Sequence, residues 1–386
     1  MLQPEKAVCD DASTKRCGSA TQRPACCPSR PILVHAAASL SAIAGLLPGR
    51  AWAHVKWFAP YDVSSSPIPI TEVITPHFLL VLTAFALLVF GGFLLDRLAA
   101  RVSVRNMMQY ENAEEHLLRA GLGAFFMALF AVGETILTPE LRTTAGWVPW
   151  LQFGIAASML STRSCALGGI GILALYCFGI VEYGVFHLTD YSMFLGLAAY
   201  MGLTSSASER LRAVRMPILC VTVCGSLMWA SIEKWVYPQW TFPILEARPY
   251  LTLGVPPDDF MVVAGFVEFA LAFYILTGFG LLRLGVFALA AIFVAAIADF
   301  GRTDAIGHMP TITSLVAIFL HGPTPLHHWL HAAKRGILIE AGKVTVSFTT
   351  AIIVFFVVYY GMQHAEYGNA AVSHAQATFA TPVKIR

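Results

Sequence analysis

The feature that most constrains this chain is a series of long apolar blocks separated by short polar stretches. Of its 386 residues, 57% are hydrophobic and only 12% are charged, whereas soluble domains carry about 25% charged residues. Runs near the ~20 residues that cross a bilayer indicate membrane-spanning helices, because backbone polar groups in lipid must be paired within the segment. We therefore predict an all-α, polytopic transmembrane bundle in a lipid bilayer. The net charge of +2 is too small to favour nucleic acid as a partner.

Ten apolar blocks follow the N-terminal region, and the basic residues between them indicate an orientation. Lys and Arg gather on the cytoplasmic side of membrane proteins. With residues 54–75 outside, strict alternation of spans places Arg97, Arg163, Arg210, Arg283 and Lys334 on that one side. This predicts a bacterial inner-membrane protein whose mature N- and C-termini are both periplasmic. The blocks cover residues 77–97, 116–137, 147–162, 164–183, 190–204, 216–236, 260–280, 284–299, 309–321 and 344–362.

The first 53 residues have the pattern of a cleaved signal peptide. A polar segment with Lys15 and Arg16 precedes an apolar run too short to span comfortably, and Ala51-Trp52-Ala53 is an A-x-A cleavage signal. We predict a signal peptide at 1–53 and a periplasmic segment at 54–75. Cleavage after Ala53 would make His54 the first residue, and its amine and imidazole together suit copper. The alternative is that cleavage simply falls before a histidine.

Two long segments of the chain resemble each other. Glu134 and Glu233 each begin an E-x4-P motif at the outer end of a predicted span, and Glu182-Tyr183 corresponds to Asp299-Phe300 further along. We predict two four-helix units, at 115–205 and 212–322, with the same orientation because each contributes an even number of spans. The remaining parts are a lead-in helix at 76–105, a cytoplasmic loop at 323–343, a last span at 344–362 and a periplasmic tail at 363–386.

Ionisable residues in the outer halves of the predicted spans, and in the outer loops beside them, are the candidate functional groups. A charged residue at the centre of a span costs roughly 2.5–3.5 kcal/mol on insertion scales, so such residues tend to be functional. One interpretation is a shared outward-facing polar pocket that holds a metal, a quinone head group or protons. The other is that the carboxylates pair with Lys234, Arg302 or backbone groups and stabilise the bundle. The candidates are Glu134, Glu182, His187, Asp190, Glu233, Glu268, Asp299, Asp304 and His308.

Histidines and aromatic residues suggest further possibilities. His187 and His308 could join His54 in a metal site, whereas His327 and His331, spaced i and i+4 in the predicted inner loop, are better explained by an interfacial helix. Aromatic residues at the outer ends of spans are typical of an interfacial belt, although stacking on a quinone is an alternative. They are Trp147, Trp150, Trp235, Tyr237, Trp240 and Tyr250.

Residues 225–322 carry three motifs in a characteristic order. These are Glu233-Lys234-Trp235, Gly265-Phe266-Val267-Glu268 and Asp304-Ala305-Ile306-Gly307-His308. With these motifs the segment resembles DoxX-like membrane proteins, which include the DoxD-type subunit of thiosulfate:quinone oxidoreductase, and the preceding unit resembles them more faintly. The resemblance implies an inner-membrane four-helix bundle associated with redox or sulfur metabolism and with quinones.

Three functional hypotheses follow from these observations. The first is a DoxX-like inner-membrane protein with a periplasm-facing polar site, acting as an accessory or quinone-linked component of a redox system beside a redox partner subunit. The second is a copper-binding or copper-handling protein that uses His54 with His187 or His308. The third is a structural or assembly subunit without a site of its own.

Overall fold

The computed structural model describes residues 55–59, 61–62, 64–102, 112–331 and 336–368. The chain divides into two compact units, Met1–Leu46 and Leu47–Arg386. The first unit lies wholly outside the described residues. The predicted signal peptide, His54 and residues 369–386 of the predicted tail also lie outside them. All described residues therefore belong to the second unit.

The prediction of an all-α fold is confirmed for the described part of the chain. Its only strand-like pairing is an isolated bridge between Thr135 and Arg142. The elements are η1 (Val55–Trp57), α2 (Ile70–Val73), α3 (Pro76–Val102), α4 (Ala113–Val132), α5 (Trp147–Ser158), α6 (Cys165–Tyr183), α7 (Val185–Thr189), α8 (Met193–Thr204), α9 (Glu209–Val236), η2 (Pro238–Trp240), α10 (Phe242–Ala247), η3 (Pro249–Thr252), α11 (Pro257–Thr277), α12 (Leu282–His321), α13 (Pro325–His331) and α14 (Ile337–Tyr367).

Seven helices of the described part are long and apolar enough to cross a membrane: α3, α4, α6, α9, α11, α12 and α14. The chain is therefore a multi-pass membrane protein. Helix α12 is 40 residues long and is kinked at Gly301, where φ is 72° and ψ is −146°. This left-handed conformation favours glycine, and the two arms of α12 cover two of the ten apolar blocks. Helices α5 and α8 have 12 residues each, which is only about 18 Å of helix against a hydrocarbon core of about 30 Å.

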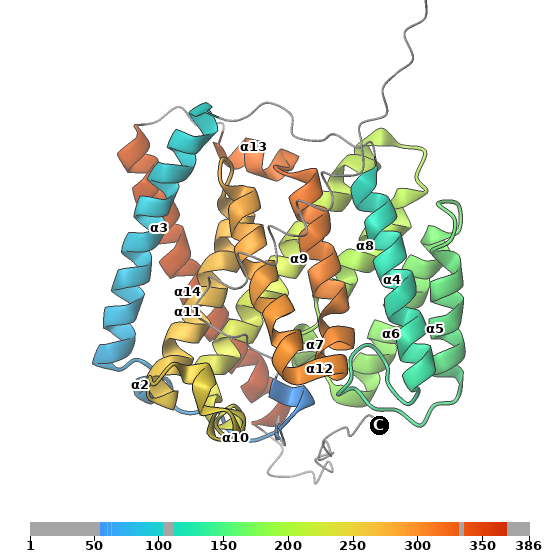
Figure 1. Ribbon diagram of the computed structural model, residues 1–386, viewed down its shortest axis with the longest axis horizontal. Helices are drawn as coiled ribbons and strands as arrows, with labels where there is room; N and C mark the ends of the chain where they lie inside the picture. The colour runs from blue at the N-terminus through green and yellow to red at the C-terminus, as the bar shows by residue number, and fades with distance from the viewer. Residues whose placement is uncertain (1–54, 60, 63, 103–111, 332–335, 369–386) are drawn as a thin grey trace, which may run out of the picture. The chain divides into compact units, whose positions relative to one another are not determined.

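The helices pack in a closed sequence of neighbours. Helices α4, α5, α6 and α8 contact one another in order, α8 contacts α9, α9 contacts α11, and α12 returns to contact α4. Helices α3 and α14 pair with each other beside α11. The short helices α2, α7 and α10 and the bend of α12 lie at one end of the bundle, here called the α10 end, and α13 lies at the other (Figure 1).

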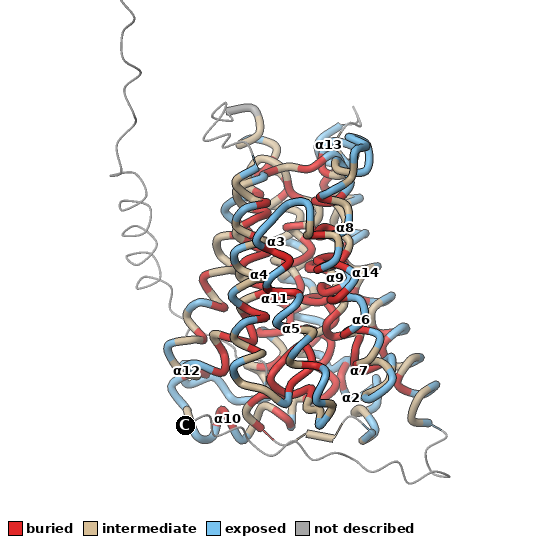
Figure 2. The backbone as a smooth tube through the Cα atoms, turned by 90° about the vertical axis from the view of Figure 1, so that its right-hand side faces the viewer, coloured by how far each residue is buried: buried red, intermediate tan, exposed pale blue. Residues whose placement is uncertain are grey.

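Small residues allow the helix axes to approach closely, as is usual where no hydrophobic effect drives packing in lipid. A Cβ atom on Gly121 of α4 would lie 2.4 Å from Thr313 of α12, and one on Gly265 of α11 would lie 2.3 Å from the Trp235 indole of α9. Buried residues run along the inward helix faces and exposed residues along the outward faces (Figure 2). Many of the outward residues are large and apolar, such as Leu80 of α3, as expected of a surface that faces lipid.

Candidate functional site

A cavity lies among η1, α9, α10, α11 and the bend of α12. It contains about 1070 Å³ of empty space, counting its open mouth. Aromatic and aliphatic side chains form most of its wall, among them Trp57, Tyr237, Trp240, Phe293 and Phe300. Five acidic or basic residues also line it, namely Asp190, Glu233, Lys234, Glu268 and His308. A mostly apolar cavity with a few convergent polar groups is the usual form of a small-molecule site.

Lys56 of η1 is the central cation beside this cavity, and only 3% of the residue is exposed. Its Nζ atom forms ion pairs with Asp190 and with Glu233, the latter at 2.6 Å from Oε2. The same atom lies 5.6 Å from the ring centroid of Tyr61 and 5.5 Å from that of Trp240, within range of cation–π attraction. These four partners, Asp190, Glu233, Tyr61 and Trp240, are called the Lys56 cage. Burial alone would lower the pKa of Lys56, but attraction by Asp190, Glu233 and Glu140 outweighs burial and raises it.

Local packing explains how Lys56 reaches the cage. The next residue, Trp57, packs against His308 of α12 with ring centroids 4.7 Å apart and an angle of 54° between the ring planes. The Trp57 ring lies where Gly307 has no side chain, since a Cβ there would come within 2.2 Å of the ring. Asp190 follows α7, and its backbone carbonyl accepts a hydrogen bond from Ser226 Oγ of α9. Glu233 lies in the last turn of α9, so three separate helices meet around one ammonium group.

A second buried polar group adjoins the cage. His187 Nε2 lies 2.8 Å from Glu140 Oε1, and the Tyr191 hydroxyl donates to the same oxygen. The Tyr61 ring of the cage packs edge-on against His187 at 5.8 Å between centroids. Burial and the nearby Glu140 carboxylate raise the pKa of Tyr191, so its hydroxyl stays a donor.

Two further pairs lie at the cavity wall. Lys234 Nζ contacts Glu268 Oε2 at 2.5 Å, the pairing that the structural interpretation of these carboxylates predicts. His308 Nδ1 lies 3.1 Å from Asp304 Oδ2, and both residues are buried. Glu268 is nevertheless directed to the cavity rather than to lipid, because it is buried and lines the cavity beside Glu233.

The nine candidate residues therefore divide into three groups. Asp190, Glu233, Glu268 and His308 line the cavity. Asp304 and His187 are buried and each pairs with a neighbouring ionisable residue. The remaining three do not line it: Glu134 and Glu182 are exposed, and Asp299 accepts a hydrogen bond from the Tyr250 hydroxyl at 3.0 Å.

The described residues offer no group of three His, Cys, Asp or Glu side chains that could hold a metal ion. His187 and His308 are each paired with a carboxylate, Glu140 and Asp304 respectively. The copper hypothesis also requires His54, which lies outside the described residues, and it therefore stays a prediction.

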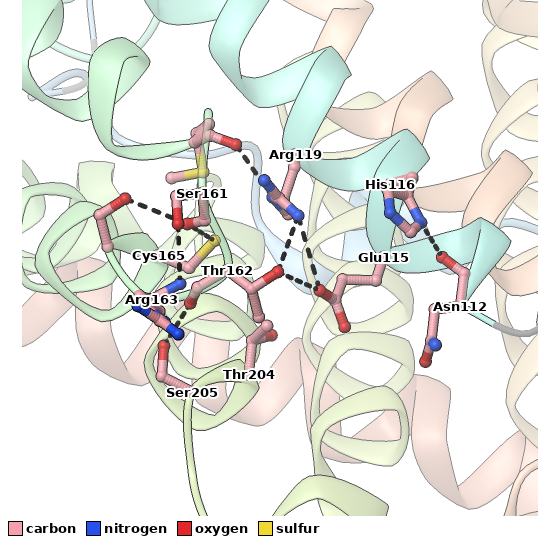
Figure 3. A network of polar contacts seen from close by, with 12 residues as sticks. Asn112, Glu115, His116, Arg119, Ser161, Thr162, Arg163, Cys165, Thr204 and Ser205 are labelled. Carbon is pink, nitrogen blue, oxygen red and sulfur yellow. Dashed lines mark hydrogen bonds and ion pairs between the residues drawn. The ribbon is translucent and has the colours of Figure 1, made fainter.

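Polar residues at the opposite end of the bundle connect helices to one another. In Figure 3, Arg119 of α4 reaches Thr162 at 2.9 Å, and Glu115 lies close to both. Glu115 also pairs with Arg215 at 3.0 Å. These arginines thus already have partners within the protein, which indicates a role in holding α4, α9 and the α5–α6 turn together.

The His327/His331 pair is explained by hydrogen bonding. His327 Nε2 lies 2.9 Å from the Ile275 carbonyl, and His331 Nε2 lies 2.7 Å from the Thr277 carbonyl. Both carbonyls belong to the last turn of α11, where backbone acceptors lack helical partners. The two histidines therefore dock α13 onto the end of α11.

Sequence reasoning missed several residues of the site. Lys56 lies in a polar segment that offers no periodic signal, and Glu140 follows a predicted span in a short loop. Tyr237 and Trp240 were interpreted as belt residues, yet both are buried and stack at 4.0 Å between centroids. Trp147, Trp150 and Tyr250 are exposed, as expected of a belt.

Comparison of the chain with protein-family models, with curated proteins and with solved structures finds no match. The function must therefore be argued from the site itself.

Proposed function

We propose that this protein is a DoxX-like membrane component of a redox system, which binds a quinone head group in the cavity at the α10 end. Electrons would be exchanged with a separate redox partner subunit. The observation that carries the proposal is the meeting of an aromatic wall with three buried carboxylates, those of Asp190, Glu233 and Glu268, and with Lys234 and His308 in one cavity.

A quinone head group is planar, apolar on its faces and equipped with two carbonyl acceptors. The rings of Trp240, Phe293 and Phe300 offer surfaces for its faces. Lys234 Nζ and the His308 ring offer donors for its carbonyls. Reduction of a quinone to a quinol also takes up two protons, and the carboxyl groups at the wall are suited to supply them.

The proposal includes a membrane topology. Ten crossings are supported by the kink at Gly301, which makes α12 two antiparallel arms, and by the short helices α5 and α8, which can be accommodated among longer neighbours. The two DoxX-like units would be α4, α5, α6 and α8, and then α9, α11 and both arms of α12. In this topology the α10 end faces the periplasm of a bacterial inner membrane.

Quenching of tryptophan fluorescence by a short-chain ubiquinone tests the proposal in purified protein. Saturable quenching is expected, and it should weaken in Trp240→Phe, because that ring lines the cavity. The matched control is Trp329→Phe, whose ring is 73% exposed on α13. Glu268→Gln should weaken binding several-fold while leaving the fold intact. If quenching is non-saturable, or if both tryptophan variants lose the same signal, the cavity does not bind quinone, and the structural-subunit hypothesis is favoured.

A further inference from the structure

The Lys56 cage has the chemistry of a site for a primary ammonium group. Two carboxylates, Asp190 and Glu233, pair with one Nζ atom, and the rings of Tyr61 and Trp240 lie 5.6 and 5.5 Å from it. Carboxylates accept the N–H bonds of an ammonium group, and aromatic faces attract its charge. Lys56, Asp190, Glu233 and Trp240 are buried, and such contacts are stronger in the protein interior than in water.

The cage shares its walls with the neighbouring cavity. Asp190, Glu233 and Trp240 belong to both. A molecule in the cavity that carried an ammonium group would therefore meet the same two carboxylates that hold Lys56. Its apolar part would remain against the aromatic wall of the cavity.

Lys56 lies on a short segment rather than on a long helix. Helix η1 has three residues. Trp57 packs on Gly307 and His308, and the next residue, Phe58, packs against Phe300 with ring centroids 4.9 Å apart. The ammonium of Lys56 thus occupies the position of a ligand while belonging to a small, separately placed element.

We propose that Lys56 is a tethered occupant of an alkylammonium-binding site, and that a primary ammonium ligand in the cavity competes with it for Asp190 and Glu233. This inference rests on the cage and does not depend on quinone binding. The primary ammonium could belong to a free amine or to the ethanolamine head group of a phospholipid, and the experiment distinguishes these two sources.

The test is chemical rescue of the full chain in detergent. Lys56→Ala removes a fragment that corresponds to n-propylammonium, so n-propylammonium chloride should raise the Tm of this variant saturably, by several degrees at about 100 times its Kd. Tetramethylammonium, which has no N–H donor, and 1-propanol, which has no charge, should not. The control Lys234→Ala loses an ammonium that pairs with Glu268 at the cavity wall, and it should not be rescued.

Equal effects of all three solutes, or of propylammonium on both variants, would overturn the proposal. If Lys56→Ala does not fold, the wild-type chain gives a second readout. Propylammonium should then increase the ratio of Lys56 acylation to that of exposed Lys343 in peptide mapping, since consumption of the reagent by the amine lowers both alike, and an unchanged ratio would count against the proposal. In nanodiscs, a higher Tm of Lys56→Ala in phosphatidylethanolamine than in phosphatidylcholine would identify the lipid as a source, whereas rescue by propylammonium alone would identify a free amine.

Discussion

Replacement of Lys56 by methionine removes the charge at the centre of the cage and keeps a side chain of similar length. The change leaves two carboxylates without their shared cation. The exposed fraction of the side chain is 2% for Lys56, 2% for Asp190 and 10% for Glu233. Removal of one partner from a buried ion pair costs about 3–5 kcal/mol. We expect Lys56→Met to lower the free energy of unfolding by an amount in that range.

The appropriate assay is reversible unfolding in mixed micelles by titration with sodium dodecyl sulfate, followed by circular dichroism. Lys343→Met is the matched control, since its Nζ atom lies 3.7 Å from Glu340 and its side chain is 46% exposed. The Glu340 side chain is only 11% exposed, but the solvent around Lys343 screens the pair, which should therefore contribute at most about 1 kcal/mol. The double variant Lys56→Met/Glu233→Gln should be less destabilised than the sum of the single variants, because each single change leaves an uncompensated partner. If Lys56→Met lowers the free energy of unfolding by less than about 1 kcal/mol, or if the two single changes add strictly, the buried pairing of Lys56 with Asp190 and Glu233 does not stabilise the fold as we expect.

Two further predictions concern packing and pH. Gly307→Ala should cost about 1–3 kcal/mol in the same unfolding assay, because the new methyl group would overlap the Trp57 ring. In the control Gly361→Ala the new methyl group has nothing within 4 Å, so this variant should be neutral or stabilised by up to about 1 kcal/mol. Equal effects of the two substitutions would contradict the packing of Trp57 on Gly307. Burial lowers the pKa of His331 below its ordinary 6.5. As the pH falls, the unfolded chain therefore binds a proton that the folded chain does not. The stability that His331 contributes is present above pH 6.5 and is lost as the pH falls below it. Tm measured from neutral to mildly acidic pH should fall less steeply in His331→Gln, and an unchanged slope would show that His331 is not the responsible group.

The helical membrane fold could be predicted because its signal is strong and local. Each apolar block is a continuous run, and all ten correspond to helical segments of the described part, with blocks 284–299 and 309–321 joined as the two arms of α12. The bounds of α5 and α8 could not be predicted. The apolar residues Met159 and Leu160 continue past Ser158, where α5 ends, and α8 begins only at Met193, three residues into its block. Hydropathy measures composition, whereas helix ends depend on turn geometry.

Most of the charged or titratable residues at the cavity wall could be predicted, including His308, but Lys56 could not. Glu233 and Glu268 are conspicuous because a carboxylate inside an apolar block is costly. Lys56 lies in a polar segment where a charge has no such cost, and it meets Asp190 across 134 residues of sequence. Glu134 and Glu182 are carboxylates near the end of an apolar block, as Glu233 is, yet they are exposed. Sequence spacing places a residue near a helix end but does not specify in which direction its side chain points.

Photoaffinity labelling of the purified chain with an azidoquinone, followed by peptide mapping, tests directly whether the cavity binds a quinone. We expect labels on the cavity residues of α9–η2 and α11, near Trp240 and Glu268, and their loss when excess unmodified quinone is added. Labels confined to the exposed faces of α3 and α14, or labels that excess quinone does not displace, would contradict the assignment of the cavity as a quinone site.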